Sequence, residues 1–142
     1  MKKNEFYKAK IESVTNEGMG VAKIDGQVVF VPGCAIGDEL NIKIVKVNKN
    51  YSYGIIDEII IPSSDRIEPE CPVYKKCGGC SFSHITYEAE LKIKEQYVKD
   101  CFVRLGKIET EFEAIEPCDT ILRYRNKAQY PVGQADKAYC GF

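Results

Sequence analysis

The sequence lacks any apolar run near the roughly 20 residues that a membrane-spanning helix requires. The N-terminal stretch MKKNEFYKAK carries two early lysines, but no apolar core and no small-residue cleavage site follow, so it is not a signal peptide. An excess of one charge is also lacking, because 20 basic residues face 21 acidic ones. Bulk charge therefore neither indicates nor excludes a polyanionic partner. These absences argue against membrane and secreted roles, and we expect a cytoplasmic protein.

Cysteine, by contrast, is abundant, with seven residues in 142. Without a secretory signal, clustered thiols bind metal more often than they form disulfides. Four cysteines are scattered, at Cys34, Cys101, Cys118 and Cys140. The other three, Cys71, Cys77 and Cys80, lie close together and are the candidate metal ligands.

The first 61 residues show alternating apolar and polar positions and many β-branched residues, interrupted by turn signals. The expected strands cover residues 6–14, 20–24, 27–31, 39–48 and 53–61. Asp25-Gly26 between two apolar runs predicts a two-residue hairpin. Five short antiparallel strands suit a small closed barrel of the oligonucleotide-binding kind, since closure removes exposed sheet edges.

The pattern breaks at residues 62–65, which mark a domain boundary before the cysteines. Thr86 can cap a helix that stops at Gly106. Apolar residues recur along it at helical spacing, namely Leu91, Val98, Cys101, Phe102 and Leu105. Strands are expected over 112–115 and 124–132, and the sequence ends inside another over 139–142. The expected fold is mainly β with one long helix: a barrel over 1–61, a cysteine-rich loop over 62–85, and a helix with the start of an incomplete α+β domain over 86–142.

Three thiols at the spacing Cys71-x5-Cys77-x2-Cys80 predict a metal site, because Pro72 stiffens this loop and the glycines after Cys77 let it wrap a compact centre. The spacing leaves the identity of the metal open. His84 would complete a zinc site of three cysteines and one histidine. An iron-sulfur cluster would need a fourth thiolate.

A second candidate site is the basic segment at residues 123–127. Arginine planes and aromatic rings pair with phosphates and stack on unpaired bases, as in single-stranded RNA recognition. The candidate residues in this segment are Arg123, Tyr124, Arg125 and Lys127, with the three basic ones expected on one strand face.

In the barrel, Lys46 and Lys49 belong to an expected aromatic and basic platform. Its candidate aromatic residues are Phe6, Tyr7, Phe30, Tyr51 and Tyr53. Some of these rings are expected in the barrel core instead. Residues 1–61 hold eight basic and eight acidic side chains, so this barrel alone would bind RNA weakly.

Two motifs carry a resemblance to a known family: Cys71-Pro-Val-Tyr-Lys-Lys-Cys77-Gly-Gly-Cys80-Ser-Phe-Ser-His84, and Tyr124-Arg125-Asn126-Lys127-Ala128-Gln129. Together they resemble the iron-sulfur type of the RNA (uracil-5)-methyltransferases. Residues 1–61 similarly resemble the TRAM domain that precedes the cluster in that family, through Gly18-Met-Gly-Val-Ala22 and Phe30-Val-Pro-Gly33.

The resemblance implies a [4Fe-4S] cluster on Cys71, Cys77 and Cys80, a fourth ligand beyond Phe142, and a structural role for His84. It also implies methylation of uridine C5 in structured RNA of the large ribosomal subunit, with S-adenosylmethionine as methyl donor. No glycine-rich cofactor turn occurs in the sequence, so the catalytic residues are expected elsewhere and this chain alone is expected to be inactive. No DNA partner is expected. The alternative is a self-standing RNA-binding module with a structural zinc or iron-sulfur site.

Overall fold

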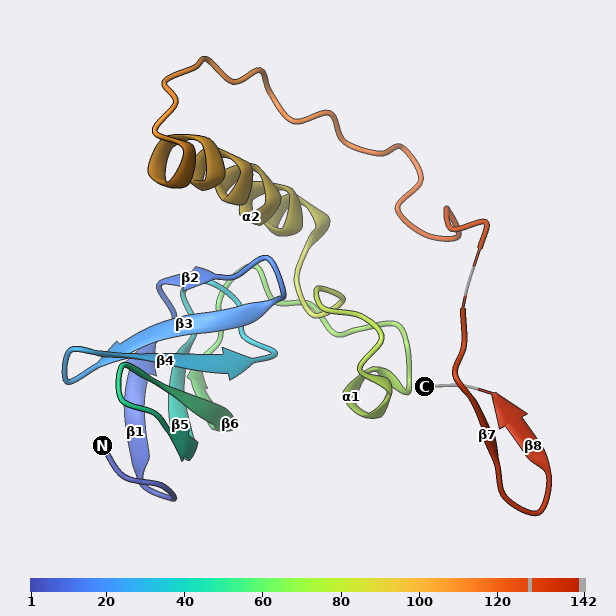
Figure 1. Cartoon of the computed structure of the whole chain (residues 1–142), viewed down its shortest axis with the longest axis horizontal. Helices are drawn as coiled ribbons and strands as arrows, with labels where there is room; N and C mark the ends of the chain where they lie inside the picture. Colours follow the sequence, from blue (N-terminus) through green and yellow to red (C-terminus); the bar gives the residue numbers. More distant parts are fainter. Residues whose placement is uncertain (128, 141–142) are drawn as a thin grey trace.

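The N-terminal part of the chain forms one curled sheet of six strands, shown in the computed structural model in Figure 1. The structure describes residues 1–127 and 129–140. The strands are β1 (Phe6–Lys10), β2 (Ser13–Val14), β3 (Met19–Ile24), β4 (Gln27–Pro32), β5 (Glu39–Val47) and β6 (Tyr51–Ile61). Their order in the sheet is β1-β5-β6-β4-β3-β2. Strand positions therefore agree closely with the sequence pattern, whereas strand number and pairing differ.

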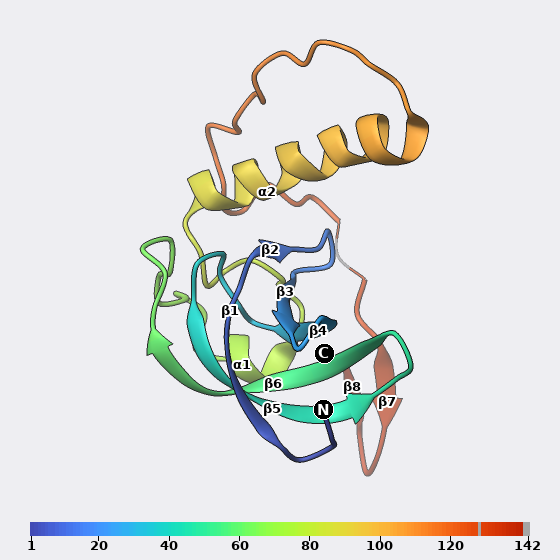
Figure 2. The same ribbon diagram turned by 90° about the vertical axis from the view of Figure 1, so that its left-hand side faces the viewer.

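The expected first strand is two strands, so the predicted count of five is wrong. The chain bends at Ile11 and Glu12, whose backbone N–H groups donate to the carbonyls of Asp38 and Val21, both at 2.9 Å. Before the bend, β1 pairs with β5; after it, β2 pairs with β3. One bent segment thus lies at both edges of the sheet, and it curls the sheet into a partly closed barrel (Figure 2).

The predicted hairpin between β3 and β4 is confirmed. Asp25 and Gly26 have φ angles of 51° and 78°, the left-handed conformation that a tight two-residue turn needs at both positions. The prediction of purely antiparallel pairing is wrong at one place, where β4 runs parallel to β6 through Val28↔Tyr51 and Phe30↔Tyr53. This pairing joins the two halves of the sheet and brings distant aromatic residues together.

The barrel core follows from the two-residue period of the strands. The side chains that point inward are fully buried aliphatic residues, which include Val29, Val31, Leu40, Ile42 and Ile44. Gly54 on β6 belongs to the same inner face, where an added Cβ would lie 2.4 Å from Ile42 Cγ2. Burial of this apolar surface is the main favourable contribution to the fold.

The long helix α2 (Tyr87–Asp100) begins where the sequence predicts. Thr86 Oγ1 accepts a hydrogen bond from Ala89 N at 3.3 Å, which makes Thr86 the N-cap. The helix continues as a π-helical segment, η1 (Cys101–Gly106), and ends at Lys107 with φ of 55°. The predicted span is therefore confirmed, including the stop at Gly106.

The predicted apolar stripe of this helix is wrong. The helix is buried through Ala89 and Ile93, which pack in one cluster with Ala35 and Ile85. Of the expected stripe, Val98, Phe102 and Leu105 are exposed, Leu105 to 80%, whereas Leu91 and Cys101 are half-buried. Helical spacing identifies an apolar face, but the contacts made by the N-terminal half of α2 decide which face meets the barrel.

The remainder of the described chain is largely extended and irregular. Only β7 (Val132–Gln134) and β8 (Ala138–Cys140) pair there, as a short hairpin. Among the described residues, the strands predicted over 112–115 and 124–132 are wrong apart from Val132, because no described strand lies beside them to pair with their backbone groups. Residue 128 of the second predicted strand lies outside the described residues. The strand predicted from residue 139 agrees with β8, while residues 141–142 lie outside the described residues.

A short helix, α1 (Tyr74–Cys77), lies between the barrel and α2 in sequence and contains one of the cluster cysteines. In the described part of the chain, no helix combines the length and apolarity that crossing a membrane requires.

Candidate metal centre and nucleic-acid interface

The three clustered cysteines lie on one loop that contains α1. Tyr74 N donates to the carbonyl of Cys71 at 3.1 Å, and Cys77 N donates to the carbonyl of Val73 at 2.8 Å. The single helical turn α1 then stops at Gly78, whose φ of 69° is left-handed. Glycine takes this conformation without strain, so the backbone reverses between Cys77 and Cys80.

These thiols differ from the barrel cysteine in accessibility. Cys71 and Cys80 are exposed and Cys77 is half-buried, and all three are reduced. Cys34 is only 1% exposed, and burial, reinforced by the nearby charge of Asp38, raises the pKa of its thiol to about 12. A buried thiol of this kind stays protonated at neutral pH and is a poor metal ligand. Cys34 thus packs in the barrel core as a small apolar residue.

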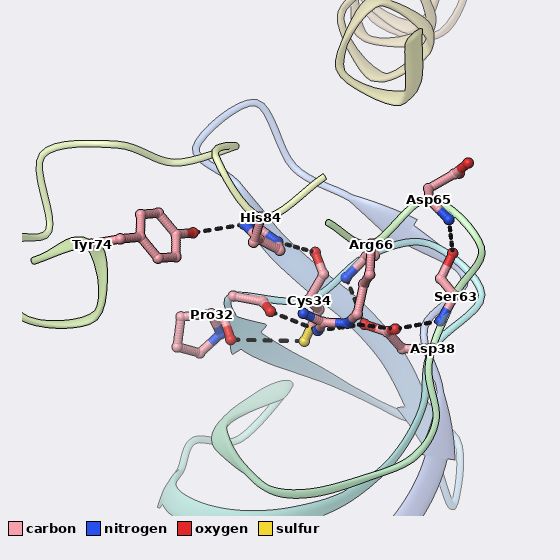
Figure 3. A network of polar contacts seen from close by, with 10 residues as sticks. Pro32, Cys34, Asp38, Ser63, Asp65, Arg66, Tyr74 and His84 are labelled. Atoms are coloured by element: carbon pink, nitrogen blue, oxygen red, sulfur yellow. Dashed lines mark hydrogen bonds and ion pairs between the residues drawn. The ribbon is translucent and has the colours of Figure 1, made fainter. Parts of the chain in front are cut away.

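His84 connects the cysteine loop to the barrel (Figure 3). Its Nε2 donates to the carbonyl oxygen of Cys34 at 2.9 Å, while its Nδ1 lies 2.6 Å from the hydroxyl of Tyr74 on α1. Burial lowers the pKa of the His84 imidazole, which favours the neutral ring. A neutral ring that donates through Nε2 accepts at Nδ1, so both nitrogens are engaged by protein groups.

Asp38 and Arg66 form the adjacent ion pair in Figure 3. Arg66 Nε and Nη2 donate to the two carboxylate oxygens of Asp38 at 2.8 and 2.7 Å, and Nη2 also donates to the carbonyl of Gly33 at 2.8 Å. The same carboxylate accepts from Ala35 N at 2.7 Å and from Ser63 N at 2.9 Å. Asp38 is fully buried, and each of its oxygens has two donors.

This pair determines where the cysteine loop returns to the barrel. Arg66 forms an isolated bridge with Ile85, and Ile67 N donates to the carbonyl of His84 at 3.1 Å. The two ends of the segment that contains the three cysteines are thus held side by side. We call the contacts of Asp38, Arg66, Tyr74 and His84 the junction.

A glycine lets the loop approach the barrel closely. Gly18, in the turn before β3, has φ of 84°, and an added Cβ there would lie 2.9 Å from Ser81 Cβ. Ser81 follows Cys80 directly in the sequence. The barrel therefore contacts the backbone beside the last of the three cysteines.

The donor set suits an iron-sulfur centre at three positions, since three accessible thiols lie on one loop with a glycine reversal. Within residues 1–127 and 129–140, no group of three His, Cys, Asp or Glu side chains has the arrangement that holds a single metal ion. Metal binding by Cys71, Cys77 and Cys80 therefore stays a prediction.

The basic segment at 123–127 is exposed but not a strand. Arg123 has φ of 58°, a left-handed conformation that an extended strand does not accommodate. The prediction that Arg123, Arg125 and Lys127 share one strand face is therefore wrong. Tyr124 is 67% exposed, so the segment presents its ring and charges to solvent.

The barrel lysines lie beside an aromatic cluster. Lys46 is the cross-strand partner of Tyr53, and Lys49 lies in the turn before Tyr51. The rings of Phe30, Tyr51 and Tyr53 contact one another with centroids 5.6 to 5.8 Å apart. Phe6 lies under Lys43 on another strand pair, and Tyr7 packs against the core. Of the predicted platform, the structure brings together these three rings and two lysines.

Residues 2–56 match the family of the TRAM domain. The barrel is a TRAM domain. Beyond this domain, the whole chain is similar to bacterial proteins named uncharacterized RNA methyltransferase. It is 43% identical to one from Clostridium tetani, with 100% of this chain and 31% of that protein covered.

Two further relatives are also named uncharacterized RNA methyltransferase. A protein of Listeria monocytogenes is 42% identical over 94% of this chain and 29% of its own length. One of Halalkalibacterium halodurans is 42% identical over 94% of this chain and 30% of its own length. The chain thus spans about 30% of the length of these relatives. A solution structure of a conserved protein of Methanococcus maripaludis is 31% identical over 41% of this chain and 83% of that chain, with a TM-score of 0.39.

Sequence reasoning missed the junction residues Asp38, Arg66 and Tyr74. Asp38 reads as an ordinary turn residue after Gly37, and Arg66 as a linker residue. One signal was present: a carboxylate just before the apolar strand β5 is a candidate for burial and therefore requires a partner. That partner lies 28 residues away in sequence, so local pattern does not identify it.

Replacement of Asp38 by Asn should destabilise the TRAM domain strongly, because it leaves the Arg66 guanidinium without its countercharge. Loss of one partner of a buried pair costs about 3 to 5 kcal/mol. Urea unfolding followed by circular dichroism measures this cost, with the exposed Glu58→Gln as the matched control. A change for Asp38→Asn as small as that for Glu58→Gln would contradict the role given to the junction.

Stability should also fall as the pH drops through about 6.5, the ordinary pKa of histidine. The folded-state pKa of His84 is lowered, so below 6.5 the unfolded chain binds the proton more readily than the folded chain. The free energy of unfolding is measured at pH 7.5 and at pH 5, for the wild type and for His84→Gln. The variant should lose less stability over this interval, and equal losses would refute the assignment.

Proposed function

We propose that this chain is the RNA-holding and cluster-holding part of an S-adenosylmethionine-dependent RNA (uracil-5)-methyltransferase that acts on large-subunit ribosomal RNA. The observation that carries the proposal is the junction, which fixes a loop with three accessible thiols onto a TRAM domain. The relatives of the chain are named RNA methyltransferases, which supports the reaction class. Position C5 of uridine and the ribosomal target rest on the motif resemblance.

Within this proposal, Cys71, Cys77 and Cys80 supply three thiolates to a [4Fe-4S] cluster. Their exposure and free thiols support this role, since no disulfide competes for them. His84 supports the cluster over zinc, because both ring nitrogens are already engaged, with Tyr74 and with Cys34 O. A zinc ion bound through His84 would have to break one of these buried hydrogen bonds. The fourth thiolate is expected from the part of the protein beyond Phe142.

The bound cluster would act as a cross-link between the two ends of an exposed loop. The junction orients the cysteine loop on the barrel. The basic side chains of this chain attract the phosphates of the RNA backbone. S-adenosylmethionine, when bound elsewhere in the protein, supplies the methyl group. None of the residues of this chain is proposed to be catalytic, and the nucleophile and general base are proposed to lie in the remaining length of the protein.

Anaerobically purified full-length protein should contain iron and acid-labile sulfide and show broad brown absorption. The triple variant Cys71→Ser, Cys77→Ser, Cys80→Ser should lose this iron, because serine hydroxyls are poor ligands for the cluster irons. Cys118→Ser, at an exposed thiol outside the loop, should retain it. Colourless protein with one zinc per chain would overturn the cluster and favour a self-standing module with a structural zinc site.

The full-length protein should transfer a radiolabelled methyl group from S-adenosylmethionine to ribosomal RNA taken from cells that lack the gene. Digestion of the RNA to nucleosides should then yield labelled 5-methyluridine. Ribosomal RNA from cells that carry the gene should accept little label, because its site is already methylated. Label on another base or only on transfer RNA would refute the uridine or the ribosomal assignment, respectively.

A further inference from the structure

We propose that Phe30, Tyr51 and Tyr53 form a stacking surface for unpaired RNA bases on the outer face of the TRAM domain, with Lys46 and Lys49 at its edge for the phosphates. We call these three rings the aromatic triad. The inference rests on the proposed RNA-binding function and deepens it, because it names the residues and the state of the RNA that they bind.

The triad exists because of the parallel pairing of β4 and β6. Phe30 is the register partner of Tyr53, and Tyr51 lies two residues before Tyr53 on the same side of β6. Phe30 contacts both tyrosines at a centroid distance of 5.8 Å, and the tyrosines contact each other at 5.6 Å. Residues more than 20 positions apart in sequence thus form one continuous aromatic patch.

The triad does not belong to the barrel core. On β4 the neighbours Val29 and Val31 are fully buried, so Phe30, between them, points to the outer face. On β6 the same alternation places Ser52 and Gly54 inside and the two tyrosines outside. Tyr51 is 39% exposed. Phe30 and Tyr53 are half-buried, so the three rings form a partly exposed aromatic patch on the outer face, which is typical of a binding surface.

Cations at the edge of the triad give it charge complementarity to RNA. Lys46 lies opposite Tyr53 across the β5–β6 pair and is exposed. In the described chain, neither Lys46 nor Lys49 forms an ion pair, whereas Lys23 on β3 contacts Glu12. Both ammonium groups are therefore free to pair with phosphates.

The turn with Lys49 is held in place from both sides. Gln27 Nε2 donates to the carbonyl of Asn48 at 3.0 Å, and Asn48 N donates to the carbonyl of Tyr51 at 2.9 Å. The first bond ties the β5–β6 turn to the start of β4. The backbone of the turn that carries Lys49 is thus fixed relative to β4 and β6, which reduces the entropy lost on binding.

Ring orientation favours unpaired bases over a duplex. The planes of Tyr51 and Tyr53 are 88° apart, and that of Phe30 is tilted by 71° from Tyr51. Bases in a regular stack are parallel to one another, so they match at most one of these rings at a time. Bases of a loop or bulge can splay and lie on separate rings, and in a duplex the base faces are hidden by stacking.

Fluorescence anisotropy tests this proposal. It measures the affinity of this chain for a labelled ten-nucleotide oligouridine and for a labelled RNA hairpin. The double variant Tyr51→Leu, Tyr53→Leu keeps apolar bulk on β6 but removes the rings. It should bind oligouridine roughly tenfold more weakly, as expected for lost base stacking. Tyr97→Leu, at a similarly exposed tyrosine on α2, should bind as the wild type does.

Salt dependence separates the rings from the lysines. Lys46→Gln should reduce the slope of log affinity against log salt by about 0.7, since each phosphate contact to a single strand contributes about this amount. The leucine variant should leave the slope unchanged. Thermal unfolding of each variant shows whether it is folded. Tyr53→Phe keeps the ring and should therefore bind oligouridine as the wild type does.

The outcomes distinguish this inference from the proposed function. If the wild type binds oligouridine but the folded leucine variant binds equally well, the triad is only a stabilising cross-strand cluster and the inference fails alone. The inference would also be overturned if the wild type and the leucine variant both bound the hairpin more tightly than oligouridine. If the wild type binds neither RNA, the proposed RNA-holding function fails with it.

Discussion

The structure depends on one buried carboxylate. Asp38 lies at the corner between the barrel core and the segment that leaves it, and it accepts four hydrogen bonds from three sources: two backbone N–H groups and the fork of Arg66. A buried carboxylate without such donors would be costly, so the barrel obliges the chain to return Arg66 to this point. The return of Arg66 brings Ile85 and His84 with it, and through them the cysteine loop.

Burial gives the cysteines different chemistry within one small protein. Cys34 contributes its backbone carbonyl to His84, while its thiol is kept protonated by burial and by the charge of Asp38. Of the three loop cysteines, Cys71 and Cys80 are exposed and Cys77 is half-buried, with the loop anchored at Gly18 and at His84. The barrel thus provides a rigid support, and the accessible thiols lie outside it.

The two proposed nucleic-acid surfaces follow a similar division. The TRAM domain has balanced charge, so its attraction for a polyanion is local and its aromatic face must contribute. The basic segment around Tyr124 lies in an extended part of the chain, where its side chains are free to adapt to a partner. A rigid stacking face and an adaptable basic segment are complementary ways to hold a folded RNA.

The sequence by itself determined the strands of the barrel, the Asp25-Gly26 hairpin, the capped helix from Thr86 and the group of three cysteines. These features depend on two-residue and helical periods, on left-handed turn residues and on short spacing, all of which are local. Only the tertiary structure decided that β4 and β6 pair in parallel, that Asp38 and Arg66 meet, and that α2 packs through Ala89 and Ile93. Each of these contacts joins residues distant in sequence, and their energy comes from burial and pairing, which no local pattern encodes.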